Sequence, residues 1–227
     1  MSMIFRITMV TVVALWASVA GATILTFDVA GGVTDFAVIN QSYGDNVSSS
    51  PDGAGHSYGV GAEGFTPNVA VAYGSAGEDP SLWTTGYGDL TNVHFNDLDG
   101  DTTFTVRFTA DAGFVVRLLD FDIASFLSGG QSIAGLEVRN GATNAILFSL
   151  GSTFITGATH LQIAPDVAAN DLILEIDLTG LGGASDDIGI DNVRFGQESV
   201  EASEAGTLAL MGGALSVVGW AARRRRG

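Results

Sequence analysis

Residues 171–179 read DLILEIDLT, and this stretch decides the fold class. Four apolar residues, Leu172, Leu174, Ile176 and Leu178, occupy alternate positions, and mostly polar residues stand between them. Successive side chains of an extended strand point to opposite faces, so the pattern predicts a strand with one buried and one solvated face. A sheet of such strands needs a second layer to cover its apolar face.

The same alternation recurs upstream, at Phe104, Val106 and Phe108 and at Leu136 and Val138. Other apolar runs are bounded by turn residues, and they predict further strands. These strands are expected at residues 23–29, 69–73, 114–123, 145–150, 160–163 and 188–195. Clusters of Gly, Asn, Asp and Ser separate the runs, and no run repeats its apolar residues at helical spacing.

The expected strand at residues 188–195 changes the parity of its apolar positions near Asp191 and Asn192, which predicts a β-bulge there. Together the strands predict one all-β domain over residues 23–197. We expect an antiparallel two-sheet β-sandwich with a jelly-roll-like arrangement. A β-barrel or a β-helix is the alternative, and no fixed-period repeat favours the β-helix.

Charge and cysteine content exclude several classes of function. The formal net charge is −16, all nine basic residues are arginine, and residues 23–197 carry 22 acidic and four basic side chains. Such a surface repels phosphate backbones, so nucleic acid is not expected as a partner. The chain has no cysteine, which excludes disulfides, thiol catalysis and cysteine-ligated zinc.

The N-terminal residues 1–22 have the layout of a secretory signal peptide. Arg6 precedes an apolar run of 13 residues at 7–19, which is shorter than the roughly 20 residues that span a bilayer. Ala20 and Ala22 form a small-residue cleavage site, so the mature chain is expected to begin at Thr23. Cleavage after Ala20 and a retained anchor are the alternatives.

A second apolar run, of 16 residues, lies at 207–222 and is followed by a basic tail at 223–227. As a helix this run extends about 24 Å, and snorkelling arginines cover part of its shortfall from a bilayer core. A single transmembrane helix with a cytoplasmic tail is therefore expected. A buried amphipathic helix is the alternative. The stop-transfer residues are Arg223, Arg224, Arg225 and Arg226.

The order of linker, short apolar helix and arginine cluster resembles the sorting tail of bacterial PEP-CTERM proteins. In the linker at 198–206, Ser203, Glu204 and Ala205 stand where that family has Pro-Glu-Pro. The resemblance implies recognition by an exosortase-like sorting peptidase. It also implies export to the cell envelope, surface or extracellular matrix through a transient membrane-anchored precursor.

Residues 55–59 read GHSYG and match the G-x-S-x-G pattern of α/β-hydrolases. That pattern works by placing a serine on a sharp turn between a strand and a helix. No helical pattern follows here, and the segment is rich in glycine and serine. We therefore interpret GHSYG as a chance match and expect a protein that is not an enzyme.

Two groups of acidic residues are candidates for calcium binding. Asp97, Asp99 and Asp101 place carboxylates at alternate positions, and hard calcium ions prefer such oxygen ligands. A solvated hairpin turn is the alternative reading of this segment.

The second group is Asp28, on the first expected strand, and Asp191, on the last. The closing stretch IGIDNVRFGQ at 188–197 is similar to the last strand of carbohydrate-binding sandwich modules. That resemblance implies adjacent terminal strands with a structural calcium between them, to which Asp186 and Asp187 could contribute. The alternative is that Asp28 and Asp191 cap strands or accept from backbone amides.

Tyr73, Trp83 and Tyr87 flank a glycine-rich stretch and are candidates for stacking on sugar rings. A small apolar cluster beneath a long loop is the alternative. His56, His94 and His160 lack zinc spacing and are expected to be surface or strand residues.

The leading hypothesis is a secreted, sorted β-sandwich that acts in adhesion, by binding extracellular polysaccharide, or in the structure of the matrix. The alternative is a secreted glycan-active or ester-hydrolysing enzyme, which would need paired acids or a serine triad in one cleft.

Overall fold

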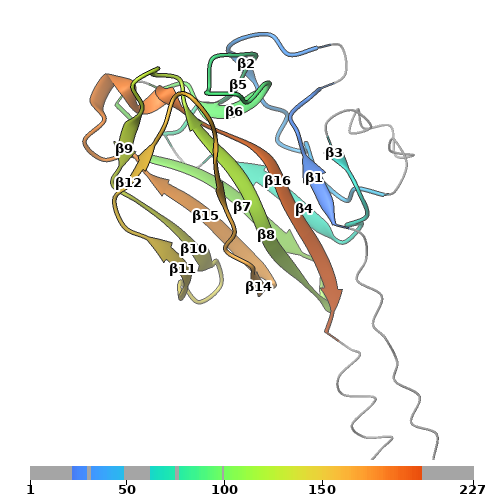
Figure 1. Cartoon of the computed structure of the whole chain (residues 1–227). Helices are drawn as coiled ribbons and strands as arrows, with labels where there is room; N and C mark the ends of the chain where they lie inside the picture. The colour runs from blue at the N-terminus through green and yellow to red at the C-terminus, as the bar shows by residue number, and fades with distance from the viewer. Residues whose placement is uncertain (1–21, 30–31, 49–61, 75–76, 99, 201–227) are drawn as a thin grey trace, which may run out of the picture.

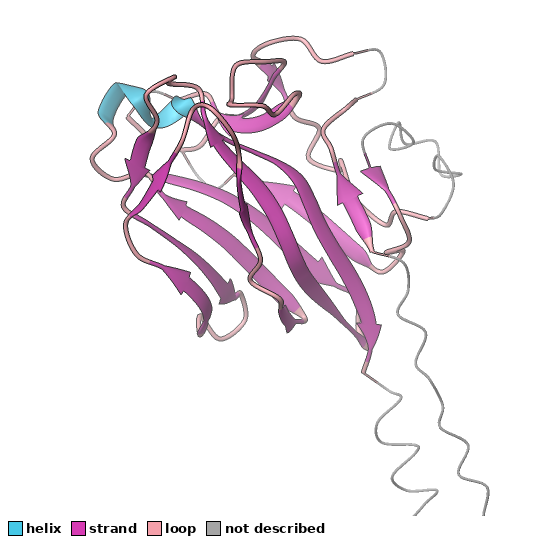
Figure 2. Cartoon of the chain, in the orientation of Figure 1, coloured by secondary structure: helices cyan, strands magenta, loops and turns pink. Residues whose placement is uncertain are grey.

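The computed structural model describes residues 22–29, 32–48, 62–74, 77–98 and 100–200 (Figure 1). Strands dominate this part of the chain, and its one helical element is the 3-10 helix η2 at Gly182–Asp187 (Figure 2). Every described strand pair is antiparallel. The prediction of an all-β antiparallel fold is confirmed.

Five strands form the smaller of two main sheets. Their order is β11 (Ile146–Leu150), β10 (Gly135–Asn140), β15 (Asp171–Asp177), β7 (Thr103–Ala110) and β4 (Val69–Tyr73). The stretch that opened the sequence analysis is the central strand, β15. Its expected apolar face is buried at Leu172, Leu174 and Ile176, so the alternation predicted the orientation of this strand correctly.

The larger sheet has nine strands. Its main path runs β13 (Leu161–Ile163), β8 (Phe114–Ser125), β16 (Ile188–Ser199), β6 (Val93–Asn96), β5 (Pro80–Trp83) and β2 (Ala37–Val38). Off this path, β14 (Val167–Ala169) pairs with β8, β1 (Thr23–Leu25) pairs with β16, and β3 (Ala62–Glu63) pairs with β1. A separate ribbon joins β9 (Gln131–Ile133) and β12 (Thr153–Ile155).

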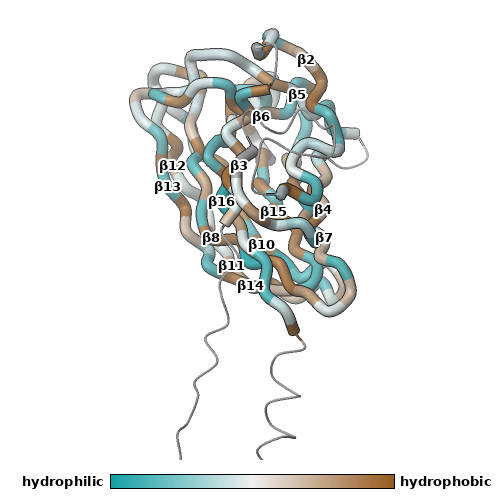
Figure 3. Tube along the Cα trace, turned by 90° about the vertical axis from the view of Figure 1, so that its right-hand side faces the viewer, coloured by the Kyte–Doolittle hydropathy of each residue, from teal (hydrophilic) through white to brown (hydrophobic). Residues whose placement is uncertain are grey.

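The two main sheets enclose one apolar core. Most buried residues of both sheets belong to one large cluster, and the ring of Phe108 on β7 meets that of Phe195 on β16 with centroids 5.1 Å apart. A second, smaller cluster contains Tyr87, Leu90, Val93, Phe95 and Ala124. Figure 3 shows apolar and polar residues interspersed along the strands, as expected when each sheet buries one face. The fold is therefore a β-sandwich.

The predicted β-bulge is present in β16. The register of β16 against β8 shifts between Asp191 and Arg194, and Asn192 has a left-handed φ of 51°. The extra residue allows Ile190 and Val193, which have opposite parity, both to face the core.

Short strands that the sequence did not predict are present, among them β2, β5 and β9, and two further differences bear on the site. The first strand ends at Leu25 rather than at residue 29, because Phe27 takes a left-handed φ of 54° and turns the chain. Strand β6 was missed because all four of its residues, including His94, are buried and no polar alternation marks it. Strands covered on both faces lose the period-2 signal.

No helix in the described ranges is long and apolar enough to cross a bilayer. Several predicted features lie outside the described residues. They are the apolar runs at 7–19 and 207–222, the GHSYG segment at 55–59, Asp99, the motif Ser203, Glu204 and Ala205, and the basic residues Arg223, Arg224, Arg225 and Arg226.

Candidate functional site

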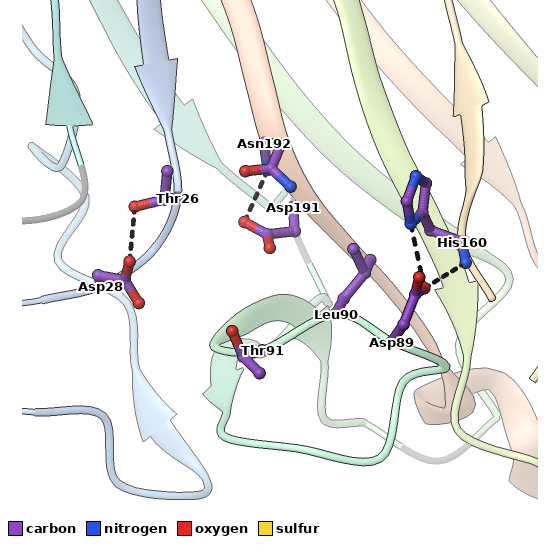
Figure 4. Close-up of a pocket in the computed structure, with 8 residues that line it drawn as sticks. All are labelled: Thr26, Asp28, Asp89, Leu90, Thr91, His160, Asp191 and Asn192. Atoms are coloured by element: carbon purple, nitrogen blue, oxygen red, sulfur yellow. Dashed lines mark hydrogen bonds and ion pairs between the residues drawn. The ribbon is translucent and has the colours of Figure 1, made fainter. Parts of the chain in front are cut away.

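A polar cavity of about 260 Å³ lies where the chain leaves β1 and β16 bulges (Figure 4). We call it the acidic pocket. It is lined by Thr26, Asp28, Asp89, Leu90, Thr91, His160, Asp191 and Asn192. In Figure 4, Asp28 and Asp89 lie on opposite sides of the pocket, with Asp191 between them. Three chain segments far apart in sequence thus bring carboxylates to one place.

Strand pairing explains how Asp28 and Asp191 meet. β1 runs antiparallel to β16 with Leu25 opposite Val193, so the residues after Leu25 pass the residues before Val193. The left-handed turn at Phe27 and the bulge at Asn192 both occur at this point. The sequence-based expectation that the first and last strands are neighbours is confirmed, and Asp28 and Asp191 line one pocket.

Asp191 is buried and poorly compensated. Its Oδ1 accepts a hydrogen bond of 2.6 Å from the backbone N–H of Asn192. The pKa of Asp191 is raised to about 8, chiefly by burial and also by the nearby carboxylates of Asp28 and Asp122. The folded chain therefore favours a protonated Asp191 unless a cation replaces the proton.

Asp122 lies on β8, opposite Asp191 in the neighbouring strand. Its Oδ2 accepts a hydrogen bond of 3.0 Å from Nδ2 of Asn192. Its Oδ1 is buried without a hydrogen-bond donor among the described residues, and His160 Nε2 lies 3.8 Å away. Asp122 was not predicted as a site residue, because a polar residue within an alternating strand normally faces solvent.

The remaining carboxylates of the pocket have donors. Asp28 accepts from Thr26 Oγ1 at 3.1 Å and from the side-chain amide of Asn92. Asp89 accepts from the backbone N–H of His160 at 2.6 Å, and Nδ1 of His160 lies 3.0 Å from the same oxygen. The backbone N–H of His160 is the main cause that lowers the pKa of Asp89. These contacts tie the loop after β5 to the segment before β13.

The donor set of the pocket is hard oxygen, which suits calcium. Within the described residues, however, no three Asp, Glu or His side chains already converge as metal ligands. A calcium ion at this site would therefore need oxygens of other types beside Asp28 and Asp191, such as amide, hydroxyl or water oxygens.

The second expected calcium cluster lies at a different corner. Asp97 and Asp101 flank the connection from β6 to β7, and Asp101 accepts from Nδ2 of Asn96 at 2.6 Å. β6 and β7 belong to different sheets, so the alternative reading as a hairpin turn is wrong. Asp186 and Asp187 lie in η2 and do not line the acidic pocket.

Two of the three expected stacking residues are core residues. Tyr73 and Tyr87 are each only 3 % exposed, so neither offers a ring face to a sugar. Their hydroxyls donate to the backbone carbonyls of Tyr43, at 2.9 Å, and Asp186, at 2.6 Å. The stacking prediction is corrected for both: the ring of Tyr73 packs against Phe27 and His94, and Tyr87 belongs to a small apolar cluster, which was the alternative prediction.

Trp83 belongs to a partly exposed group of rings. Phe36 meets it edge-on with centroids 4.6 Å apart, and Phe126 does so at 5.7 Å. Phe36 is 54 % exposed and Phe126 is 41 % exposed. We call Phe36, Trp83 and Phe126 the aromatic patch. Neither phenylalanine was predicted, because single aromatic residues in separate loops carry no pattern.

The loop at 84–92 connects the aromatic patch with the acidic pocket. At one end, Gly86 packs so closely on Phe126 that a Cβ there would lie 2.6 Å from Cε2 of the ring. Farther along, Asp89, Leu90 and Thr91 line the pocket. The backbone N–H of Asn92 donates to the carbonyl of Thr84 at 2.9 Å and closes the loop.

A groove of about 230 Å³ on the five-stranded sheet is lined by three acidic residues, of which Glu137 and Glu175 share one arginine. Arg139 bridges them, donating through Nε to Glu137 at 2.7 Å and through Nη2 to Glu175 at 2.8 Å. Because the Arg139 guanidinium binds the carboxylates of both Glu137 and Glu175, we interpret the three residues as an ion network between β10 and β15 and not as a catalytic acid–base pair.

No protein-family model and no curated protein matches the chain. Among solved structures, it is similar to the CBM4 module, with 14 % identity and a TM-score of 0.35 over 71 % of this chain and 100 % of that one. It is similar to the CBM22-1 and GH10 modules of the Clostridium thermocellum endo-1,4-β-D-xylanase 10B, complexed with xylohexaose. That match has 11 % identity and a TM-score of 0.34, and it covers 55 % of this chain and 25 % of that one.

A third similar structure is the family 11 carbohydrate-binding module of the cellulosomal cellulase Lic26A-Cel5E of Clostridium thermocellum. It has 12 % identity and a TM-score of 0.31, and the match covers 57 % of this chain and 88 % of that one. At such identities and TM-scores, these matches carry no statement about a ligand of this chain.

Proposed function

We propose that the chain is an exported, non-enzymatic adhesion protein that binds extracellular polysaccharide at the aromatic patch. The observation that carries this proposal is the edge-on group in which the exposed rings of Phe36 and Phe126 flank the half-buried ring of Trp83. Aromatic side chains bury large apolar area with few rotatable bonds, and the apolar faces of sugar rings can stack on them. A contiguous exposed group of rings in a water-soluble domain is a typical binding feature.

The charge of the domain restricts the class of polysaccharide. Residues 23–197 carry a large excess of acidic side chains, so an anionic polymer would be repelled over most of the surface. A neutral glycan meets no such repulsion. The proposed ligand is therefore a neutral polysaccharide or one of its oligosaccharides.

Calcium is the proposed cofactor of the acidic pocket. Asp28 and Asp191 would hold the ion. Its positive charge would also favour Oδ1 of Asp122, which has no hydrogen-bond donor in the part of the chain that the structure describes. When bound, the ion supplies charge neutralisation to this group of carboxylates. The loop at 84–92 both lines the pocket and contacts the aromatic patch. An ion that orders this loop would therefore also hold Gly86 against Phe126.

Export and sorting are proposed on the sequence patterns of the two ends. The signal peptide at 1–22 would lead to export, and an exosortase-like peptidase would act on a membrane-held precursor. Figure 1 supports a tethered binder: the end of β16 lies at one end of the sandwich, while β2 and β5, next to the aromatic patch, lie at the other. The patch would then face away from the membrane.

A glycan array and a panel of chromogenic glycoside and ester substrates test the proposed function together. We expect the wild-type chain to bind neutral glycans on the array in the presence of calcium, and we expect it to hydrolyse none of the substrates. Failure to retain any neutral glycan would contradict the binding proposal. Turnover of a substrate that Trp83→Ala leaves unchanged would favour the hydrolase instead.

A further inference from the structure

The strand β11 leaves one edge of the five-stranded sheet open. It pairs with β10 on one side, and no described segment pairs with its other side. Ile146 is 56 % exposed and Leu147 is 38 % exposed, although both are large apolar residues. An exposed apolar edge of this kind is a template for pairing with another strand.

The opposite edge of the same sheet is closed by side chains. On β4, the backbone N–H of Val71 donates to Asp45 Oδ1 at 2.6 Å. The N–H and C=O of Tyr73 bond to the side-chain amide of Gln41 at 3.0 and 2.9 Å. The C=O of Val69 accepts from the backbone N–H of Asn46 at 2.8 Å. One edge of the sheet is thus covered residue by residue, and β11 has no comparable cover among the described residues.

The described edges of the larger sheet are short. β2 has two residues, and β13 and β14 have three each, whereas β11 has five. Short edge strands are one of the ordinary ways in which sheets avoid association. Among the described edge strands, β11 therefore combines length, apolar character and an uncovered side.

Charge singles out the same region. The chain has 34 charged residues, yet none lies between Asn140 and Pro165, where His160 is the only titratable side chain. This segment contains β11 and also the exposed Phe154 on β12. Two copies of a chain with a net charge of −16 repel each other over most of their surface, and this uncharged edge is where the repulsion is weakest.

We propose that β11 is a self-association edge, on which β11 of a second copy of this chain pairs antiparallel about a two-fold axis. With Phe148 at the axis, Phe148 faces its own copy and Ser149 lies beside Leu147, which bulges out of the register between β10 and β11. Each contact pairs an apolar residue with an apolar or small uncharged one, so the strand is complementary to itself. The two five-stranded sheets become one continuous sheet.

The pairing is weak, because five residues a side bury far less than the roughly 1,600 Å² of a stable interface. Association is therefore concentration-dependent, and it gains importance when many copies are held on one surface. This inference does not rest on carbohydrate binding.

Cysteine cross-linking of the full chain in mild detergent tests the proposal, because the chain has no native cysteine. Ser149→Cys places a thiol on the exposed side of β11, and Val38→Cys places one on the exposed β2 as the control. With a short bis-maleimide, Ser149→Cys is expected to form covalent dimers and Val38→Cys is not. Adding Leu147→Lys to the Ser149→Cys chain is expected to abolish the dimer, whereas adding Val38→Lys leaves it.

Equal cross-linking of the two single-cysteine chains would overturn the proposal, and so would a dimer that survives Leu147→Lys. The unmodified chain gives a second, independent readout by amide hydrogen exchange at low and high protein concentration. Exchange of the β11 amides is expected to slow as the concentration rises, while β4 is unchanged. Exchange in β11 that does not depend on concentration would overturn the proposal even if a variant failed to fold.

Discussion

Asp191 of β16 lies opposite Asp122 of β8, so two buried carboxyl groups face each other on neighbouring strands. Like charges in directly opposed positions destabilise a sheet. The carboxylate of Asp28 lines the same pocket as Asp191. The pKa of Asp191 is raised to about 8, chiefly by burial. The arrangement costs stability when the pocket is empty and suits a site that binds a cation.

Asp191→Asn tests this reading by melting temperature. In EDTA at neutral pH the variant is expected to be more stable than the wild type, by an amount on the order of 1 kcal/mol, because an uncompensated buried acid is removed. Calcium is expected to stabilise the wild type by about 2.7 kcal/mol at a hundredfold excess over Kd, and to do much less for the variant.

Asp111→Asn is the matched control, since it removes one acidic charge from an exposed position. It should respond to calcium as the wild type does. A wild-type melting temperature that stays the same in EDTA and in millimolar calcium would remove the acidic pocket from consideration as a metal site.

The pH dependence of stability has a defined sign. The folded pKa of Asp191, about 8, is above its usual value of 3.8, so between these values the folded chain binds more protons than the unfolded chain. The contribution of Asp191 to the free energy of unfolding is therefore lost as pH rises toward 8. In EDTA, the stability of Asp191→Asn relative to wild type should grow steadily from pH 5 to pH 8.

The difference in unfolding free energy between Asp191→Asn and wild type does not contain the effect of His94. Burial lowers the pKa of His94 from 6.5 to about 4, so its contribution to stability rises with pH between those values. Both chains carry His94, and its slope cancels in their difference. Urea unfolding at each pH supplies the measurement, and a difference that does not change with pH would show that Asp191 does not titrate as described.

Gly86→Ala tests the link between the loop and the aromatic patch. Gly86 has a φ of +102°, and the added Cβ would meet the ring of Phe126 at 2.6 Å. Gly77 has a similar φ of +96° with nothing within 4 Å of the added atom. Both alanine variants carry backbone strain, so only Gly86→Ala is expected to displace Phe126 and weaken glycan binding. Equal loss of binding in both variants would argue against a role for the Phe126 contact.

The basic tail has its own test. Replacing Arg223, Arg224, Arg225 and Arg226 by Ser is expected to reduce retention of the membrane-held precursor, because arginine transfer into a bilayer costs about 2.5–3.5 kcal/mol per residue at its centre. Cell fractionation compares the variant with the wild type. The same distribution of both between membrane and medium would contradict the stop-and-sort proposal.

Alternation predicted the strands that have one solvated face, whereas the short strand β6, which is covered on both faces, carried no such signal. β15 and β7 alternate apolar and polar residues because one side of the small sheet faces water. β6 is covered on both sides and carries His94 and Asn96 inside the domain, so no alternation marks it. The bulge at Asn192 was predictable because two apolar pairs of opposite parity had to reach one core.

The candidate site was predictable only where neighbouring strands fixed it. Asp28 and Asp191 come together because β1 pairs with β16. The position of Asp122 beside Asp191 depends on the register of a third strand, β8, and no local sequence pattern predicts that register. Phe36 and Phe126 contact Trp83 because of the conformations of their loops, which the sequence pattern does not predict. Tyr73 and Tyr87 were therefore predicted as stacking residues in their place.

The central claim is that a neutral glycan binds at the aromatic patch. Calorimetric titration tests it most directly, with a neutral oligosaccharide that binds the chain on the array and with wild type compared with Trp83→Ala in calcium. Loss of one stacking ring should weaken binding by about 1 kcal/mol, which is roughly fivefold in Kd. Phe154→Ala, which removes an exposed ring on β12, should bind as the wild type does. Undiminished binding by Trp83→Ala would contradict the account, because the glycan would then not lie on the aromatic patch.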